Sequence, residues 1–287
     1  MPEPDDSAHS ALDPVAVVGL GRMGSGIAAS YARSGRRVYG VDPFATHTVE
    51  GVELVDLSAA MRETDVMVLS LPGGDQVQSV VDALVSAECQ SLIIDTSTCD
   101  PAETQRRAAQ LAKAGGQLVD APVSGGPSGA EAGQLTVFLG CPVPLIDRVS
   151  AELRPLAGQV NHVGEVGAGN TAKLMNNLLC AINLCSARAV LDVCAKASIE
   201  PDRLIDAINT ASGRSGVTEV NMPRWVLNET FDSGFPVGLM ARDVDLALEV
   251  ATNLSIDSPV AAAAGAMWSQ LLQETGPETD FNRMAQS

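Results

Sequence analysis

The chain has 287 residues, of which 46% are hydrophobic and 18% charged, and its formal net charge at pH 7 is −17. This is a globular composition with room for two domains. A strongly acidic surface excludes nucleic acid and anionic membranes as the expected partners. We expect no membrane span, because no apolar run looks long enough. We expect a cytoplasmic location, because the acidic N-terminus lacks the basic and apolar segments of a secretion signal.

The sequence offers no pattern typical of a metal site. Its six cysteines form no C-x-x-C pair, and no group of histidines accompanies them. We therefore expect reduced thiols, with neither a bound metal nor a disulfide framework. Residues 1–13 are acidic and contain proline, and we expect a disordered tail there.

The first predicted elements carry a dinucleotide-binding fingerprint. Val15–Gly19 is an apolar run typical of a buried strand, and an apolar-periodic helix follows from Met23 to about Ser34. A second strand, Arg37–Val41, ends at Asp42. The turn before the helix is a G-x-G-x-x-G made of Gly19, Leu20, Gly21, Arg22, Met23 and Gly24. Strand, glycine turn, helix, strand and acidic residue in this order predict a site for the pyrophosphate of a dinucleotide.

Asp42 indicates which dinucleotide is bound. A carboxylate at the end of the second strand can accept both ribose hydroxyls of NAD, but it repels the 2′-phosphate of NADP. Pro43 and Phe44 follow it, and no arginine stands there to bind that phosphate. We therefore expect NAD rather than NADP. The alternative is that Asp42 only caps the next turn.

Alternating strands and helices continue to about residue 163. We expect strands at 66–71, 91–95, 117–120 and 135–139, and helices at 75–85, 102–114 and 144–156. This alternation predicts a Rossmann-type, doubly wound α/β sheet, whose ligands lie beyond the carboxyl ends of the strands. Three segments follow strands at that edge: Leu71-Pro72, Ser97-Thr98 and the glycine-rich Ser124-Gly125-Gly126. The exposed N–H groups expected in the last segment suit a carboxylate.

Only helical patterns follow Val163. The stretch from about Asn170 to Ala197 is apolar at helical spacing, which predicts a helix roughly 40 Å long that joins two domains. Further helices are expected at 201–210, 222–228, 238–253 and 258–274, with a short turn within 279–286. We place the boundary near Val163–Gly167, between a dinucleotide-binding domain at 14–165 and an all-α substrate and dimerisation domain at 166–287.

Lys173 is the candidate catalytic residue. It is one of three lysines in the chain, and it lies four residues before Asn177, on the same face of the long helix. The helix dipole and burial both disfavour a positive charge there, so we expect the pKa of Lys173 to fall towards that of a usable acid or base. The alternative is a solvent-facing lysine.

Four motifs together resemble the β-hydroxyacid dehydrogenases, a family that includes 3-hydroxyisobutyrate dehydrogenase, tartronate semialdehyde reductase and, more distantly, 6-phosphogluconate dehydrogenase. They are the glycine turn at 19–24, Asp95-Thr96-Ser97-Thr98-x-x-Pro101, Asp120-Ala121-Pro122-Val123-Ser124-Gly125-Gly126, and Gly167-Ala168-Gly169-x-x-x-Lys173-x-x-Asn176-Asn177. The resemblance implies hydride transfer between NAD and the β-hydroxyl of a small 3-hydroxy acid, in a homodimer or homotetramer.

The resemblance also implies roles for individual residues. Lys173 would be the catalytic acid and base, and Asn177 would orient the substrate. The glycine turn would hold the pyrophosphate. The nicotinamide side of the cofactor would be lined by Leu71, Pro72, Gln76 and Thr98, and the substrate carboxylate would be held by Ser124, Gly125 and Gly126.

One position departs from the family pattern. Members usually carry a second lysine in a Lys-Asp-Leu stretch, and Arg242 stands at that place here, followed by Asp243. Arginine keeps the positive charge needed to hold a cofactor or substrate anion, but it does not titrate in the working range. We therefore expect a binding role for Arg242, and none in proton transfer.

Two alternative functions stay open on the same fold. Imine reductases resemble these enzymes but usually lack the lysine, so Lys173 argues against that activity. An NAD-binding scaffold or sensor without catalysis is the second alternative, which the replacement at Arg242 keeps open.

Overall fold

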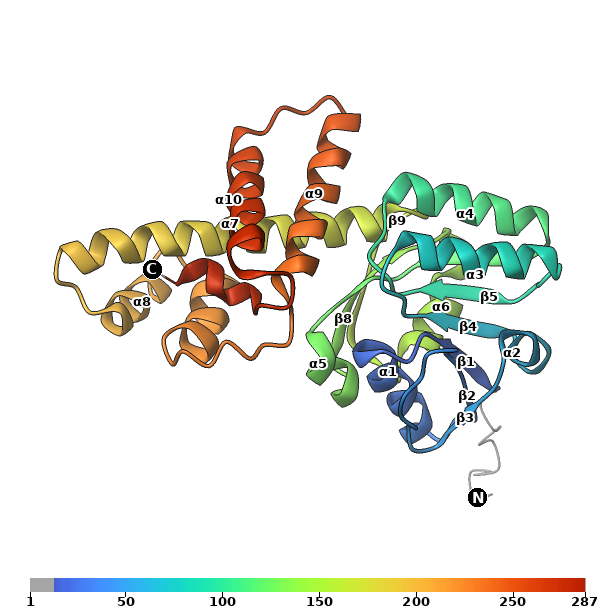
Figure 1. The fold of residues 1–287 in the computed structure, drawn as a ribbon. Helices are drawn as coiled ribbons and strands as arrows, with labels where there is room; N and C mark the ends of the chain where they lie inside the picture. Colours follow the sequence, from blue (N-terminus) through green and yellow to red (C-terminus); the bar gives the residue numbers. More distant parts are fainter. Residues whose placement is uncertain (1–12, 287) are drawn as a thin grey trace, which may run out of the picture. The chain divides into compact units, whose positions relative to one another are not determined.

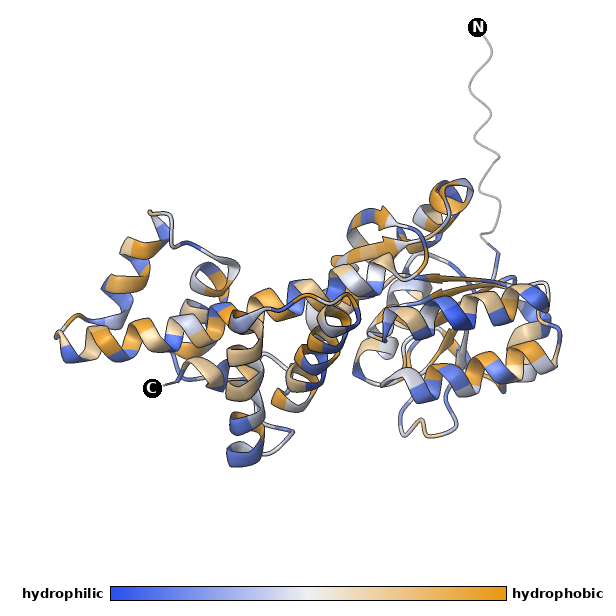
Figure 2. Ribbon diagram, turned by 90° about the horizontal axis from the view of Figure 1, so that it is seen from above, coloured by the Kyte–Doolittle hydropathy of each residue, from blue (hydrophilic) through white to orange (hydrophobic). Residues whose placement is uncertain are grey.

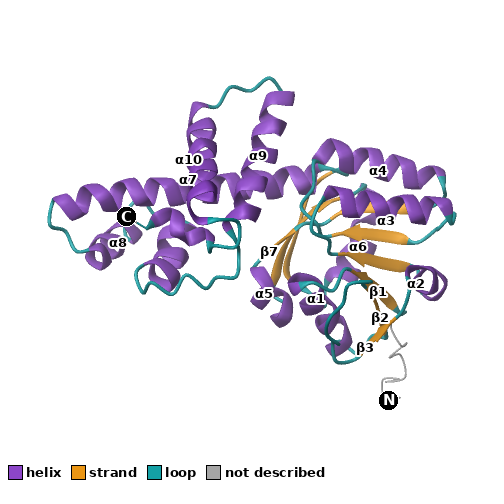
Figure 3. Ribbon diagram, in the orientation of Figure 1, coloured by secondary structure: helices purple, strands orange, loops and turns teal. Residues whose placement is uncertain are grey.

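The computed structural model of the chain describes residues 13–286, so nearly all of the predicted tail, residues 1–13, lies outside the described part. By their contacts the residues divide into two units, one ending at Lys173 and the other beginning at Leu174. The first is an α/β domain and the second is helical, which confirms the predicted fold class (Figures 1 and 3). The division falls inside helix α7 (Ala168–Lys196), later in the chain than the boundary that we predicted.

The first unit is built on one sheet, in the order β3-β2-β1-β4-β5-β6-β8-β7, with β9 paired to β8. Strands β3 to β6 are parallel and have the doubly wound order. Strand β8 runs antiparallel to β6 and β7 and parallel to β9. The strands are β1 Val15–Val18, β2 Val38–Val41, β3 Val52–Leu54, β4 Val66–Leu69, β5 Leu92–Asp95, β6 Gln117–Asp120, β7 Val123–Ser124, β8 Leu135–Gly140 and β9 Ala157–Gly164.

Helices cover both faces of this sheet. Val15 and Val17 of β1 pack in a core cluster with helices α1 (Arg22–Arg33), α5 (Gly126–Ala132) and α6 (Ile146–Leu153). The alternate residues Ala16 and Val18 pack with α2 (Leu57–Glu63), α3 (Gly74–Ser86) and α4 (Pro101–Lys113). The inner strands are therefore buried on both faces. They are largely hydrophobic (Figure 2), and β1 and β4 read as unbroken apolar runs for this reason.

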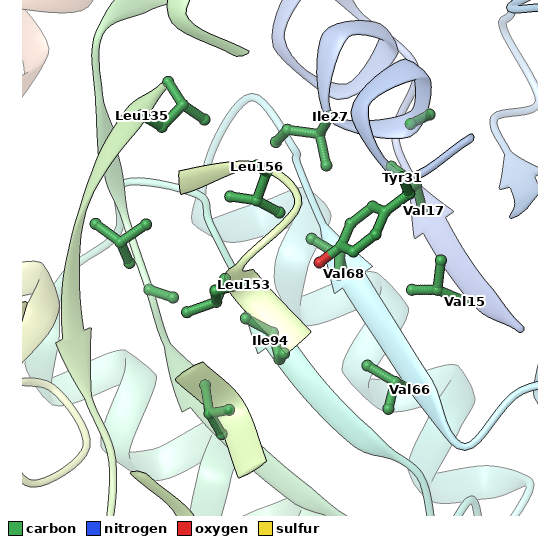
Figure 4. Close-up of a cluster of buried hydrophobic side chains, with 14 of the residues drawn as sticks. Val15, Val17, Ile27, Tyr31, Val66, Val68, Ile94, Leu135, Leu153 and Leu156 are labelled. Atoms are coloured by element: carbon green, nitrogen blue, oxygen red, sulfur yellow. The ribbon is translucent and has the colours of Figure 1, made fainter. Parts of the chain in front are cut away.

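Tyr31 fixes helix α1 against helix α6. Its ring is fully buried among Ile27, Leu153 and their neighbours (Figure 4). Its hydroxyl donates a hydrogen bond of 2.9 Å to the carbonyl oxygen of Glu152. Burial raises the pKa of Tyr31 above its ordinary value. Helix α1, whose first residues belong to the glycine turn, is thus joined to α6.

Several short elements were not predicted, and one of them changes the description of a candidate site. We expected Ser124-Gly125-Gly126 to be a glycine-rich loop beyond the strand at 117–120; the structure instead has Ser124 at the end of β7 and Gly126 at the start of α5. Gly125 and Gly126 have φ angles of 129° and 65°, in the region that favours glycine. With only seven residues, α5 is too short to show a helical period. Elements β3 and α2 were also missed.

The second unit packs helices around Trp268, which is fully buried and donates a 3.4 Å hydrogen bond from Nε1 to the carbonyl oxygen of Ala181. The predicted helix at 222–228 begins earlier, at Val217, and is a π-helix that contains Pro223. The elements are α7 from Leu174 onward, α8 Pro201–Asn209, π-helix η2 Val217–Val226, α9 Val237–Asn253, α10 Pro259–Thr275 and the 3₁₀-helix η3 Phe281–Ala285; a further 3₁₀-helix, η1 Val143–Leu145, belongs to the first unit.

Helix α7 is unusually apolar for the amount of it that is buried. It is long and apolar enough to cross a bilayer, so our expectation that no such run exists is wrong. The core helix of a soluble domain can meet the same criteria, which makes this weak evidence for a membrane. Only 28% of its most apolar window is buried. Its exposed large apolar residues are Met175, Leu179, Val190 and Val193.

Candidate active site

The glycine turn between β1 and α1 is shaped to admit a phosphate backbone. Gly19 has a φ angle of 92°, and a Cβ there would collide with the carbonyl oxygen of Ser70. A Cβ on Gly24 would collide with the carbonyl oxygen of Gly19, so both glycines are needed for close packing. At Gly21, in contrast, no atom of the described residues lies within 4 Å of where a Cβ would be. The turn is therefore open beside Gly21, at the start of α1, which fits the approach of a pyrophosphate.

Asp42 connects this turn to the segment that follows β2. Its Oδ2 accepts a 2.8 Å hydrogen bond from the N–H of Leu20, and its Oδ1 accepts one of 2.8 Å from the N–H of Phe44. The second bond is the turn cap that we considered as the alternative. A carboxylate oxygen can accept more than one bond, so contact with a ribose stays a prediction. Of the remaining turn residues, Arg22 is exposed and Met23 packs against the core.

The segments that follow β4 and β5 are joined by hydrogen bonds. The N–H of Leu71 donates to Ser97 Oγ at 3.0 Å, and the N–H of Ser97 donates to Asp95 Oδ1 at 2.9 Å. Because β4 and β5 are neighbours, the structure places Leu71 and Thr98 at adjacent strand ends. Pro72 is exposed, as is Gln76 in the first turn of α3.

Asp95 is a buried carboxyl group with little compensation. It is 1% exposed, and its Oδ2 has no hydrogen-bond partner among residues 13–286. Burial raises the pKa of Asp95 from 3.8 to about 6, and the charge of nearby Asp120 adds to the shift. The hydrogen bonds from Ser97 and the charge of Arg107 oppose it.

Asp120, the last residue of β6, holds the start of helix α7. Its Oδ1 accepts a 2.7 Å hydrogen bond from the N–H of Gly167, and its Oδ2 accepts one of 2.7 Å from the N–H of Asn170. Asn170, in turn, accepts at Oδ1 from the N–H of Cys99 and donates from Nδ2 to Thr104 Oγ1. Burial raises the pKa of Asp120 to about 6, and the two backbone N–H groups oppose the shift.

Lys173 lies three residues beyond Asn170 on the same helix. It is buried, with 7% of its surface exposed, whereas Lys113 and Lys196 are both exposed. The alternative of a solvent-facing lysine is therefore wrong. The burial meets the condition for the catalytic role, and the role itself stays a prediction.

In the second unit, Asn177 and Arg242 share one buried carboxylate. Asn177 Nδ2 donates to Asp243 Oδ2 at 2.7 Å, and Arg242 donates from Nη2 and Nε to Asp243 Oδ1 at 2.9 and 3.2 Å. Asp243 is 1% exposed, while the side chain of Arg242 is 35% exposed. The side chain of Arg242 is therefore bound to Asp243 and partly open to solvent.

Sequence reasoning named no role for Asp120, Asn170 or Asp243, which form these hydrogen-bond networks. A signal existed for two of them. Asp120 is an acidic residue at the end of an otherwise apolar strand, and Asp243 follows the arginine that replaces the family's lysine. An acidic residue among buried neighbours needs hydrogen-bond partners, so both Asp120 and Asp243 could have been predicted to bind neighbouring groups.

A doubly wound sheet with this glycine turn is the architecture of a dinucleotide-binding domain, and the buried lysine near the start of α7 is a candidate acid and base. Comparison with known proteins agrees. Residues 14–164 match the family described as the NAD binding domain of 6-phosphogluconate dehydrogenase. Residues 167–287 match the one described as NAD-binding of NADP-dependent 3-hydroxyisobutyrate dehydrogenase.

Individual relatives cover nearly the whole chain. The 2-(hydroxymethyl)glutarate dehydrogenase of Eubacterium barkeri is 30% identical, over 87% of this chain and 86% of its own length. The 2-hydroxy-3-oxopropionate reductase of Escherichia coli is 30% identical, over 94% and 95%. The solved structure of Mycobacterium tuberculosis 3-hydroxyisobutyrate dehydrogenase with L-serine has a TM-score of 0.89 at 28% identity, over 95% of this chain and 98% of that one.

The chain therefore belongs to the β-hydroxyacid dehydrogenase family, as the four motifs predicted. It is a hydroxyacid dehydrogenase, an oxidoreductase that acts on a CH–OH group and carries NAD(P)-binding domains.

Proposed function

We propose that the protein transfers a hydride between NAD and the β-hydroxyl of a small 3-hydroxy acid, with Lys173 as the acid and base. The observation that supports this most directly is the burial of Lys173, on a helix whose first turn is held by four hydrogen bonds to Asp120, Cys99 and Thr104. A buried ammonium is easier to deprotonate than an exposed one, which suits proton transfer.

The chain's own residues bind, orient and move the proton. In the oxidising direction Lys173 Nζ takes the proton of the substrate hydroxyl, and in the reducing direction it returns the proton to that oxygen. The substrate carboxylate is held by the hydroxyl of Ser124 and the N–H groups of Gly125 and Gly126, which fixes the carbon that reacts. Asn177 orients the substrate, with its amide held by Asp243. The nicotinamide, when bound, supplies the hydride acceptor or donor.

We further propose NAD as the preferred cofactor, held at the pyrophosphate by residues 19–24. The negative charge of Asp42 disfavours a 2′-phosphate, and the adjoining Phe44 cannot neutralise one. Leu71, Pro72, Gln76 and Thr98 line the nicotinamide side, and Arg242 binds an anionic group of cofactor or substrate. A side-by-side assay with NAD and NADP tests the preference, and a higher kcat/KM with NADP would overturn it.

The substrate class is a small acid with a hydroxyl on the β-carbon. Relatives are named for 3-hydroxyisobutyrate, 2-hydroxy-3-oxopropionate and 2-(hydroxymethyl)glutarate, and one was solved with L-serine. 2-(Hydroxymethyl)glutarate carries a second carboxylate, to which the partly exposed guanidinium of Arg242 offers a positive charge. A panel of these four acids ranks them by kcat/KM: 2-hydroxy-3-oxopropionate, a β-aldehyde, is reduced with NADH, the others are oxidised with NAD, and the absorbance of NADH is followed in both cases.

The test of the mechanism is Lys173→Ala, with Lys113→Ala as the matched control. We expect kcat to fall by about 10²–10⁴-fold, the usual worth of an acid–base group. The affinity for NAD, measured by calorimetry, should stay unchanged because the glycine turn is untouched. Lys113 is exposed on α4, so its variant should turn over normally. Normal turnover in Lys173→Ala would overturn the assignment.

We also propose that the protein assembles as a homodimer or homotetramer through α7. At 100° per residue Met175, Leu179, Val190 and Val193 lie within about 60° of one another, so they form one exposed apolar stripe. Covering such a stripe removes apolar surface from water, and a second copy of the helix has the matching surface. Analytical ultracentrifugation of Leu179→Glu and Val193→Glu should show smaller particles than the unaltered protein, and equal particle sizes would contradict the proposal.

A further inference from the structure

The carboxylate of Asp120 has no role in the reaction described above, although it is fully buried beside the start of α7. We propose that Asp120 is a positioning residue that sets the location of Lys173, by holding the first turn of α7 against the end of β6. This inference rests on the proposed function for the identity of Lys173 as the acid and base.

Both oxygens of Asp120 are committed to the helix start. The bonds to the N–H groups of Gly167 and Asn170, each 2.7 Å long, satisfy two of the donors that a helix leaves unpaired at its beginning. A carboxylate also complements the positive end of the helix dipole. Since Lys173 follows Asn170 by less than one turn, fixing the backbone of Asn170 fixes the base of the lysine side chain.

Asn170 supplies a second set of bonds to the same turn. Its side chain accepts from the N–H of Cys99 at 2.9 Å and donates to Thr104 Oγ1 at 3.2 Å, and the residue is fully buried. Cys99 follows the segment Ser97-Thr98, which leaves the end of β5. The start of α7 is therefore tied both to β6 and to the strand-end loop whose Thr98 is a predicted cofactor contact.

Two glycines let the carboxylate reach the helix. A Cβ on Gly140, which pairs with Asp120 across the sheet, would collide with Asp120 Oδ1 and lie 2.7 Å from the nitrogen of Gly169. A Cβ on Gly169 would collide with the carbonyl oxygen of Phe138 and lie 2.9 Å from Asp120 Oδ2. Neither position has room for a side chain, so β8 and the start of α7 lie in close backbone contact. Gly169 in the motif Gly167-x-Gly169 thus serves the same contact.

Capping the helix alone would not require a buried carboxylate at position 120. Asparagine caps helices about as well as aspartate does, without an ionised group in a buried site. The carboxylate, in contrast, accepts from two backbone donors at once and so defines both the position and the direction of the helix start. A reaction that depends on the placement of one amine requires such a definition, because small displacements of a catalytic group are costly.

The experiment labels lysines in Asp120→Asn. The chain has only three lysines, so competitive acetylation followed by mass spectrometry reads each one separately. Asparagine keeps one acceptor oxygen but turns an NH₂ group towards the second donor. We expect the labelling rate of Lys173 to rise about fivefold, the worth of one cap. The rates of exposed Lys113 and Lys196 should not change, and kcat should fall while KM for NAD stays constant.

The matched control is Asp56→Asn, which weakens the cap of another helix in the same unit, where Asp56 Oδ1 accepts from the N–H of Ala59. It should leave the labelling of Lys173 and the kcat unaltered. An unchanged Lys173 rate in Asp120→Asn, or an equal rise at all three lysines, would overturn the proposal. The labelling needs no turnover, so it separates this proposal from the mechanism: if Lys173→Ala stays active, the function is wrong, whatever the labelling shows.

Discussion

Replacing Asp95 by asparagine should stabilise the protein increasingly as the pH rises. Asp95 Oδ1 accepts from the N–H of Ser97, and asparagine keeps that bond. Its Oδ2 has no partner within residues 13–286, so the substitution breaks no hydrogen bond at that oxygen. What it removes is the cost of ionising a carboxyl group that is 1% exposed.

The magnitude follows from the shift in the pKa of Asp95, which burial raises from 3.8 to about 6. An aspartate with a raised pKa contributes stability that is present below pH 3.8, and this contribution is lost as the pH rises through 6. The loss amounts to about 3 kcal/mol in total, at 1.36 kcal/mol for each pKa unit. About half of it falls between pH 5 and pH 8.

The assay is urea denaturation of the unaltered protein and Asp95→Asn at pH 5, 6, 7 and 8. The difference in the free energy of unfolding should grow in favour of the variant by about 1.5 kcal/mol over this range. Asp56→Asn is the control, because the hydrogen bond from Ser58 lowers the pKa of Asp56 and its contribution is lost as the pH falls. Its difference should not grow in favour of the variant. A difference for Asp95→Asn that stays flat or shrinks with rising pH would refute the reasoning.

Three further outcomes follow from packing and hydrogen bonds. Gly169→Ala should lower the free energy of unfolding by about 1–3 kcal/mol and reduce kcat, because its Cβ meets backbone and the Asp120 carboxylate; urea titration and steady-state rates check both. Tyr31→Phe should cost about 1 kcal/mol in thermal denaturation without changing kcat, since only its buried hydroxyl bond is lost. Asp243→Ala and Asn177→Ala should each destabilise, and a double-mutant cycle should show a coupling of about 0.5–3 kcal/mol, whereas additive effects would mean that the hydrogen bond contributes nothing.

Much of the first unit could be predicted because its strands are buried on both sides. Strands such as β1 and β4 are apolar at every position, and the glycine turn lies in a fixed place between a strand and a helix. The short elements could not be predicted in this way. Helix α5 contains glycine and proline, and its start depends on two φ values that only glycine tolerates readily. The hydrophobic periodicity of the sequence does not reveal where such a helix starts.

The sequence predicted those parts of the candidate site whose signal lies within one short segment. Lys173 was found by its rarity and its place on a helix, and its burial agrees with that choice. The role of Asp120 depends on partners 47 and 50 residues away along the chain, and that of Asp243 on a partner 66 residues away. Such contacts exist only after the sheet and helices have assembled, so no local pattern announces them.

Asp42 has a consequence for attempts to change the cofactor. Its two oxygens already join the glycine turn at Leu20 to the segment at Phe44, so the protein's own backbone holds these two segments together. Removing the carboxylate to admit a 2′-phosphate would also break these two hydrogen bonds, which join the segments that follow β1 and β2. If the proposed preference for NAD holds, a variant designed to use NADP would need a neutral acceptor at position 42 together with a cation nearby.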